Sequence, residues 1–129
     1  MKKVWINGCF DVLHRGHIEL FRFAKKNGDY LVVGIDSDSR VKQLKGSQRP
    51  VNNQDDRKFF LESIKYIDAV TIFETENQLI EEIANLKPDV MIVGSDYRNK
   101  RVVGSEGAKK LIFFDRVGDY STTKILEEK

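Results

Sequence analysis

Hydrophobic side chains along this chain alternate between the spacing of strands and the spacing of helices. Five short apolar runs have almost no polar interruption. Runs of this kind are typical of strands that are covered on both faces, as in a parallel sheet. We therefore predict five strands, at residues 4–6, 30–35, 69–73, 90–93 and 111–114.

Amphipathic segments with apolar residues three and four positions apart lie between the apolar runs. Two of them have clear ends, residues 18–26 before Asn27-Gly28 and residues 78–86 before Lys87-Pro88. We expect further helices at residues 39–44, 53–66 and 122–128. The alternation predicts an α/β fold, a Rossmann-like parallel five-stranded sheet with helices on both faces, formed as a single domain by residues 1–129.

Polar residues gather after four of the five predicted strands. In a parallel sheet the ligand sits beyond the carboxyl ends of the strands, where the strand order reverses. Loops are polar in most proteins, but these loops are dense in residue types that suit a phosphate. They are residues 8–17, Asp36-Ser37-Asp38, Gly94-Ser95-Asp96-Tyr97, and the stretch with Asp115-Arg116 and Ser121-Thr122-Thr123-Lys124.

The first of these loops has the strongest chemical meaning and reads G-C-F-D-V-L-H-R-G-H over residues 8–17. His14 and His17 fall on one face in the first turn of the predicted helix. A helix start attracts phosphate through its unpaired N–H groups, and imidazoles add donors. Gly8 and Gly16 would let a nucleotide approach the backbone. We expect Cys9 to sit in a packed turn, because nothing beside it would activate a thiol.

Basic residues supply further candidates for phosphate contact. Lys45 precedes a flexible Gly46-Ser47-Gln48 loop and could close over a triphosphate or be a solvated loop lysine. Arg57 lies near the start of a predicted helix, where the helix dipole favours acids, so it needs an anionic partner. That partner could be Asp55, Asp56 or a ligand.

Two groups near the end of the chain also suit phosphate. Arg116 follows the last predicted strand, where a bidentate contact is natural. The run Ser121-Thr122-Thr123 begins the last predicted helix, and its hydroxyls can cap that helix while its N–H groups face a ligand.

Composition narrows the functional class. The chain of 129 residues is long enough for a core, and its net charge of +2 is too small to indicate nucleic-acid binding. No apolar run approaches the ~20 residues that span a bilayer, and the single cysteine excludes an internal disulfide, so we expect a cytoplasmic protein. The patterns GxxxxGK[ST] and GxGxxG are absent from the sequence, which argues against a P-loop kinase and a nicotinamide dehydrogenase.

The histidine loop and the later motifs together resemble the bacterial sugar-phosphate nucleotidyltransferases, over nearly the whole chain. Two groups of that superfamily are similar. The adenylyltransferase domain of ADP-heptose synthases is similar at Asn7-Gly8, Leu44-Lys45-Gly46, Arg49-Pro50-Val51-Asn52, Asp96-Tyr97 and Val103-Gly104-Ser105. Glycerol-3-phosphate cytidylyltransferases are similar at residues 28–33, at Arg57-Lys58 and at residues 121–125.

The resemblance implies transfer of a nucleotidyl group from a nucleoside triphosphate to a sugar phosphate, with release of pyrophosphate. The expected pair is ATP and D-glycero-D-manno-heptose 1-phosphate, and the alternative is CTP and glycerol 3-phosphate. A nucleotide-binding module without turnover is the alternative from another class. A bridging Mg2+ is expected, without a named protein ligand. A homodimer is also implied, in which Ile18, Leu20, Phe21 and Phe23 form the contact unless they merely cover their own sheet.

The resemblance also implies roles for single residues. His14, His17, Lys45 and Arg116 would be catalytic, contacting and neutralising the phosphates. Asp11 would order the histidine loop or a metal-bound water, and Asp96 would meet the nucleotide or the acceptor hydroxyls. The implied nucleotide-binding residues are Gly8, Cys9, Phe10, Asp11, Gly16, Arg57, Gly94, Asp96, Ser121, Thr122 and Thr123.

Overall fold

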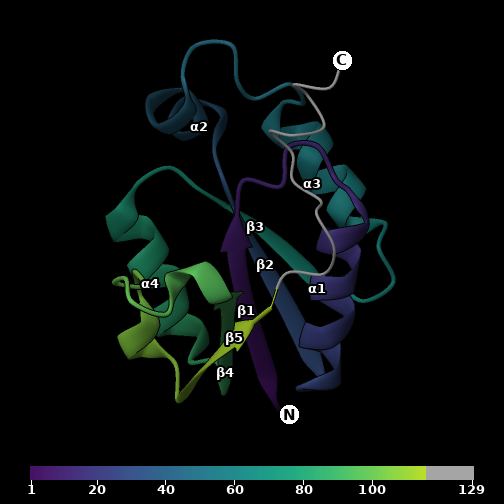
Figure 1. The fold of residues 1–129 in the computed structure, drawn as a ribbon, viewed down its shortest axis with the longest axis vertical. Helices are drawn as coiled ribbons and strands as arrows, with labels where there is room; N and C mark the ends of the chain where they lie inside the picture. Colours follow the sequence, from purple (N-terminus) through teal and green to yellow (C-terminus); the bar gives the residue numbers. More distant parts are fainter. Residues whose placement is uncertain (116–129) are drawn as a thin grey trace.

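The computed structural model describes residues 1–115, in which five parallel strands form one sheet (Figure 1). The strand order is β3-β2-β1-β4-β5, as expected for a Rossmann-like layer. All five predicted strands are present, so that part of the prediction is confirmed. Their bounds are β1 Lys3–Gly8, β2 Tyr30–Asp36, β3 Ala69–Phe73, β4 Val90–Gly94 and β5 Lys110–Phe114.

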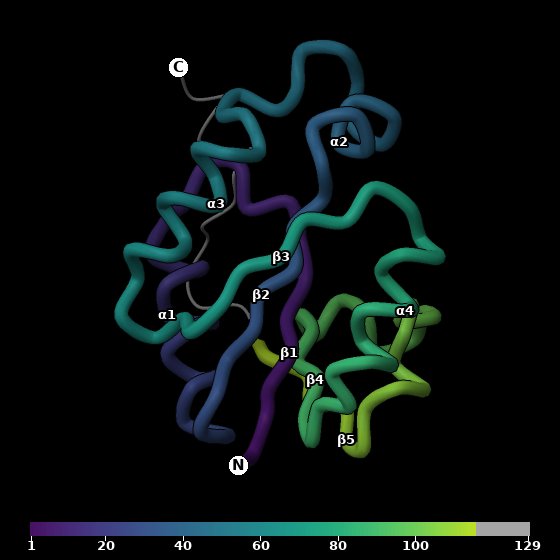
Figure 2. The backbone as a smooth tube through the Cα atoms, turned by 180° about the vertical axis from the view of Figure 1, so that it is seen from behind, coloured from purple at the N-terminus to yellow at the C-terminus, as the bar shows by residue number. Residues whose placement is uncertain are grey.

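Helices cover both faces of the sheet (Figures 1 and 2). Helices α1 (Arg15–Lys26) and α3 (Gln54–Glu62) pack on one face, and α4 (Glu76–Leu86) packs on the other. Helix α2 (Asp38–Lys45) stands beyond the carboxyl end of β2, at the top of Figure 1. Two short 3-10 turns, η1 (Ser95–Tyr97) and η2 (Ser105–Gly107), join β4 to β5. None of the helices within residues 1–115 is long and apolar enough to cross a membrane.

The apolar face of α1 is used inside the chain. Phe21 is fully buried, and Ile18, Leu20 and Phe23 are partly buried against the same core cluster of β1, β2 and α3 side chains. These four residues therefore cover their own sheet, which was the alternative to a subunit contact. The homodimer stays a prediction that rests on the resemblance.

Helix α3 is shorter than the sequence predicts, because it ends at Glu62 and not at residue 66. The Ser63 hydroxyl donates to the Phe59 carbonyl at 2.9 Å, which ties up an acceptor of the last helical turn. Two further turns then carry the chain onward, with Ile64 N donating to Leu61 O and Ile67 N donating to Ile64 O. Ile67 still reaches the core, so its spacing fits a helix although its backbone is not helical. The predicted helix at residues 122–128 lies outside the described residues.

Gly34 lets the largest side chain of the core lie flat against β2. A Cβ at Gly34 would lie 2.5 Å from Trp5 Cζ2 and 2.6 Å from Trp5 Cη2. Trp5 is buried, and its Nε1 donates to Asn7 Oδ1 at 2.9 Å. The indole therefore has little freedom to move away from an added methyl group.

We predict that Gly34→Ala lowers the free energy of unfolding by about 1–3 kcal/mol, the usual cost of overpacking a core. Urea denaturation followed by circular dichroism measures the loss. In a Trp5→Phe background, Gly34→Ala should lower the free energy of unfolding by less, because phenylalanine lacks the ring atoms that the added methyl group would contact. An equal loss in both backgrounds would contradict the contact.

Candidate active site

The carboxyl ends of β1 and β4 separate, and a cavity of about 390 Å3 lies there. β1 stays paired with β2 as far as Gly8, but it pairs with β4 only at Val4 and Trp5. The cavity is lined by residues 6–10, by residues 92–94 and by side chains of α2 and α4. This is the point where the strand order reverses, and therefore the position expected for a ligand in such a sheet.

The two histidines cap the start of α1. His14 is the residue before the first helical turn, and its Nδ1 accepts from Gly16 N at 3.1 Å. His17 Nδ1 in turn accepts from His14 N at 3.1 Å. Such reciprocal capping is usually made by a serine or threonine together with a glutamate or glutamine. The two rings stack with their centroids 3.8 Å apart, as the prediction of one shared face requires.

This cap fixes the tautomer of both rings. Because each Nδ1 accepts a backbone N–H, the hydrogen-bond pattern assigns the proton of the neutral ring to Nε2. Burial lowers the pKa of His17 to about 4, assisted by the charges of His14 and Lys45. At neutral pH His17 is therefore an uncharged imidazole with an Nε2–H donor. That group suits hydrogen bonding to an anionic oxygen and not proton abstraction.

Phe10 packs its ring against His17. Its backbone has φ 48°, in the left-handed region, and its ring packs edge-on to His17 with centroids 5.4 Å apart. The same ring lies 5.1 Å from that of Phe21. A Cβ at Gly8 would lie 3.1 Å from the Phe10 ring, so within the chain the glycine makes room for this aromatic side chain.

Asp11 ties the histidine loop to the segment that precedes α3. It is 2% exposed, and its Oδ2 accepts from Val51 N at 2.7 Å and from Arg49 Nε at 3.0 Å. Its Oδ1 accepts from Asn52 N at 2.8 Å. Burial raises the pKa of Asp11, but these hydrogen bonds outweigh burial and hold the pKa below its usual value. Of the two expected roles, the geometry therefore gives Asp11 the ordering of the loop.

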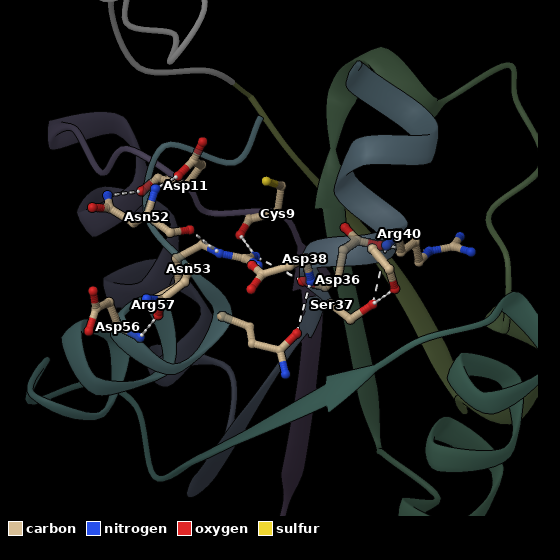
Figure 3. Close-up of polar contacts among 12 residues, drawn as sticks. Cys9, Asp11, Asp36, Ser37, Asp38, Arg40, Asn52, Asn53, Asp56 and Arg57 are labelled. Carbon is tan, nitrogen blue, oxygen red and sulfur yellow. Dashed lines mark hydrogen bonds and ion pairs between the residues drawn. The ribbon is translucent and has the colours of Figure 1, made fainter. Parts of the chain in front are cut away.

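Arg57 is fully buried, and it gathers three loops (Figure 3). Its Nη1 donates to Cys9 O at 3.0 Å and to Asp36 O at 2.8 Å. Its Nε donates to Asn52 O at 3.0 Å, and its Nη2 to Asp38 Oδ1 at 2.9 Å. The loops after β1 and β2 and the start of α3 are thus held by one guanidinium.

The predicted partners of Arg57 were wrong. Asp55 and Asp56 lie exposed in the first turn of α3, while the anionic partner is Asp38, the first residue of α2. A nucleotide contact by Arg57 is also corrected, because the buried guanidinium is surrounded by protein groups. Arg57 therefore acts as a positioning residue, because it holds the loops that form the site.

Lys45 closes α2 and lines the cavity together with Cys9 and Gly94. Its positive charge acts on both Cys9 and His17, so the three groups lie near one another. The contact of Lys45 with a triphosphate stays a prediction. Burial raises the pKa of the Cys9 thiol, which fits a packed turn and not a nucleophile. Asp96 lies in η1, two residues after Gly94. A Cβ at Gly94 would lie 2.6 Å from Asp96 Oδ1, so the glycine leaves room for the Asp96 carboxylate.

Some predicted residues are not placed, and some lining residues were not predicted. Arg116, Ser121, Thr122 and Thr123 lie outside the described residues. The cavity is also lined by Asn7, Arg40, Tyr97 and Arg101, of which none was chosen from the sequence as a site residue. Arg40 had one usable signal, because it lies on the predicted helix at residues 39–44, which Lys45 directly follows. Arg101 had none, since it stands in an irregular loop.

A parallel sheet in this order, with a cavity where the order reverses and a histidine-capped helix start, defines a Rossmann-like α/β protein with a candidate ligand site at the carboxyl edge of its sheet. The chain belongs to the cytidylyltransferase-like family, whose model matches residues 5–128. Over residues 1–115 the parallel five-stranded sheet with helices on both faces agrees with the fold class predicted from the sequence.

Relatives and solved structures agree with this family. The bifunctional protein HldE of Campylobacter fetus is 48% identical over 125 residues, 97% of this chain and 27% of the relative. HldE of Helicobacter pylori strain P12 is 46% identical over 127 residues, 98% of this chain and 27% of the relative. The chain thus spans about a quarter of the length of these curated relatives.

Two solved structures share the fold. A lipopolysaccharide core biosynthesis protein from Thermoplasma volcanium has a TM-score of 0.71 at 27% identity, covering 94% of this chain and 99% of its own. Pantothenate synthetase from Thermus thermophilus has a TM-score of 0.64 at 14% identity, covering 97% of this chain and 61% of its own. The second likeness concerns the fold alone.

We predict that Arg57→Met lowers the free energy of unfolding by about 3 kcal/mol or more, because buried carbonyls lose their donor at about 1–3 kcal/mol each. Arg57→Lys should lose less, since it keeps the charge but not the planar fork. Chemical denaturation measures both. Lys58→Met, at the next position of α3, is the control and should lose less than about 1 kcal/mol. Equal losses at both positions would contradict the clamp.

The His17 pKa predicts a pH dependence of stability. Between pH 6.5 and about 4 the unfolded chain binds a proton at His17 that the folded chain does not bind. The free energy of unfolding should therefore fall as the pH is lowered through this window. His17→Gln keeps a side chain that can accept the His14 N–H and removes the titration, so its profile should be flatter. Urea denaturation at stepped pH values measures both profiles, and parallel profiles would contradict the lowered pKa.

Proposed function

We propose that this chain transfers a nucleotidyl group from a nucleoside triphosphate to a sugar phosphate and releases pyrophosphate. ATP and D-glycero-D-manno-heptose 1-phosphate are the substrates that we favour, with ADP-heptose as the product. The observation that carries the proposal is the stacked His14–His17 pair, which places two imidazoles at a helix start beside a cavity lined by Lys45. Family membership and the HldE relatives support it.

The proposed reaction needs positioning and charge stabilisation more than proton transfer. An oxygen of the sugar phosphate attacks the α-phosphorus, the bond to the bridging oxygen breaks, and that oxygen leaves with pyrophosphate. Because a phosphate nucleophile is already an anion near neutral pH, no strong base is required. The enzyme holds two anions together and stabilises the charge that develops on the phosphoryl oxygens.

The histidines fit this requirement through their tautomer. Each Nδ1 is occupied by a backbone N–H, so in the proposed mechanism Nε2–H is the group with which each ring would donate to a phosphate oxygen. A neutral donor stabilises developing negative charge without taking up a proton. The ammonium group of Lys45, whose charge already acts on His17, neutralises the transferred phosphate. Arg116 and the run Ser121-Thr122-Thr123 are proposed to bind the leaving phosphates.

Magnesium is part of the proposal as a companion of the nucleotide. Within residues 1–115 no group of three or more histidine, cysteine or acidic side chains is placed to hold a metal ion. Both oxygens of Asp11 already accept hydrogen bonds from the chain. The described residues therefore do not form a protein ligand set, and the ion would be held by phosphate oxygens and water.

CTP with glycerol 3-phosphate is the second candidate, favoured by the family's cytidylyltransferase-like description and by the similarity at Arg57-Lys58. A nucleotide-binding module without turnover is less favoured, because the histidines and the loop lysine that would handle charge are all present. A cytoplasmic location and a homodimer are proposed on the resemblance alone.

We predict pyrophosphate release when purified protein receives magnesium, ATP and the heptose 1-phosphate. A screen of each triphosphate against several sugar phosphates measures it. Turnover only with CTP and glycerol 3-phosphate would replace the favoured substrates by the second candidate. No turnover with any pair would favour the binding module.

Matched variants test the mechanism within the same assay. His14→Ala and His17→Ala should each lower turnover by ~10²–10³, the usual effect of removing a donor to a developing anion. Arg15→Ala is the control, because Arg15 stands between the histidines with its side chain 71% exposed. Histidine variants with activity close to that of the control would contradict the assigned role.

A further inference from the structure

One wall of the cavity is basic. Arg40 and Lys45 line it from α2, and Arg101 lines it from the segment between η1 and η2. Asp36 is the only acidic residue of the lining among the described residues, and it is paired with Arg40. The wall therefore carries a net positive charge in a confined space, which favours an anionic ligand.

Arg40 is held with part of its guanidinium unused. Its Nε donates to Asp36 Oδ1 at 2.7 Å, and its guanidinium carbon lies 5.6 Å from the centroid of the Phe73 ring. Within residues 1–115 the two terminal nitrogens have no acceptor. Arg40 and Arg57 lie on opposite sides of the turn formed by residues 36–38 (Figure 3). A fixed fork of two nitrogens matches the paired oxygens of a phosphate.

Asn7 adds a neutral donor to the same cavity. Trp5 Nε1 donates to Asn7 Oδ1 at 2.9 Å. Because an indole N–H is only a donor, this contact orients the amide with its oxygen toward Trp5. The amide nitrogen of Asn7 is left to donate its hydrogens to a phosphate or a sugar hydroxyl.

Arg101 can leave its ion-pair partner with little loss of stability. Its side chain is 68% exposed, and its Nη1 lies 3.8 Å from Glu76 Oε1, which is itself 50% exposed. An exposed pair at this distance contributes little to stability. The guanidinium can therefore exchange that partner for a ligand in the cavity.

The reaction geometry distinguishes an acceptor from a nucleotide at this wall. In an in-line displacement the entering and leaving oxygens lie on opposite sides of the reacting phosphorus. The proposed function assigns the triphosphate to the histidines at the start of α1, so the acceptor has to enter from another side. Helix α2 carries both Arg40 and Lys45 in the cavity lining, and the proposed function assigns the transferred phosphate to Lys45.

We infer that Asn7, Arg40 and Arg101 form the acceptor subsite and bind the phosphate of the sugar phosphate. This inference rests on the proposed function and deepens it. Arg40 and Arg101 contact the phosphate oxygens, Asn7 donates to a phosphate oxygen or a neighbouring hydroxyl, and Lys45 lies between acceptor and nucleotide. None of the three contacts the triphosphate, so their loss affects the two substrates differently.

The test compares Michaelis constants for the two substrates in pyrophosphate release. Arg101→Ala and Arg40→Ala should each raise the KM for the sugar phosphate by about tenfold or more, because each removes a charge-assisted hydrogen bond. The KM for the triphosphate should stay within about twofold. Arg98→Ala is the matched control, since Arg98 lies three residues before Arg101 and does not line the cavity. Arg101→Ala is the safer variant for folding, because that side chain is exposed.

The outcomes separate this inference from the proposed function. An active wild type whose Arg101→Ala and Arg40→Ala variants keep the KM for the sugar phosphate would overturn the subsite alone. A rise of similar size in the KM for the triphosphate would indicate that these residues bind the nucleotide, and it would also overturn the acceptor subsite. A wild type that is inactive with every substrate pair would overturn the proposed function, and the subsite with it.

Discussion

The buried guanidinium of Arg57 is the constraint on which the site depends. A charge removed from water has to find partners at its N–H groups, since the cost of an unpaired buried cation is large. Here the partners are the carbonyls of Cys9, Asp36 and Asn52, and the carboxylate of Asp38. These groups come from three different loops. Satisfying one side chain therefore fixes the loops after β1 and β2 relative to the start of α3.

Asp11 repeats this logic with the opposite charge. Its buried carboxylate collects the N–H groups of Val51 and Asn52 and the guanidinium of Arg49. Asn52 serves both buried groups, because its carbonyl accepts from Arg57 while its N–H donates to Asp11. The two charges are thereby joined through one residue, and the histidine loop is anchored on both sides.

The histidines show how a local need of the backbone can set chemistry. A helix start has N–H groups without partners, and the Nδ1 atoms of His14 and His17 accept two N–H groups there. The same contacts place the proton of each neutral ring on Nε2. One set of hydrogen bonds therefore both stabilises the helix end and makes the rings donors. Burial lowers the pKa of His17 and so keeps that ring neutral.

The sequence by itself determined the elements and the residues of local motifs. Apolar runs predicted all five strands, and the spacing of His14 and His17 predicted their shared face, because periodicity and short spacing are local properties. The tertiary structure alone decided the partner of Arg57 and the contacts of Asp11. It also decided which unpredicted side chains, such as Arg101, reach the cavity. These outcomes depend on which loops meet at the strand ends, and pairing between residues distant in sequence leaves no local pattern.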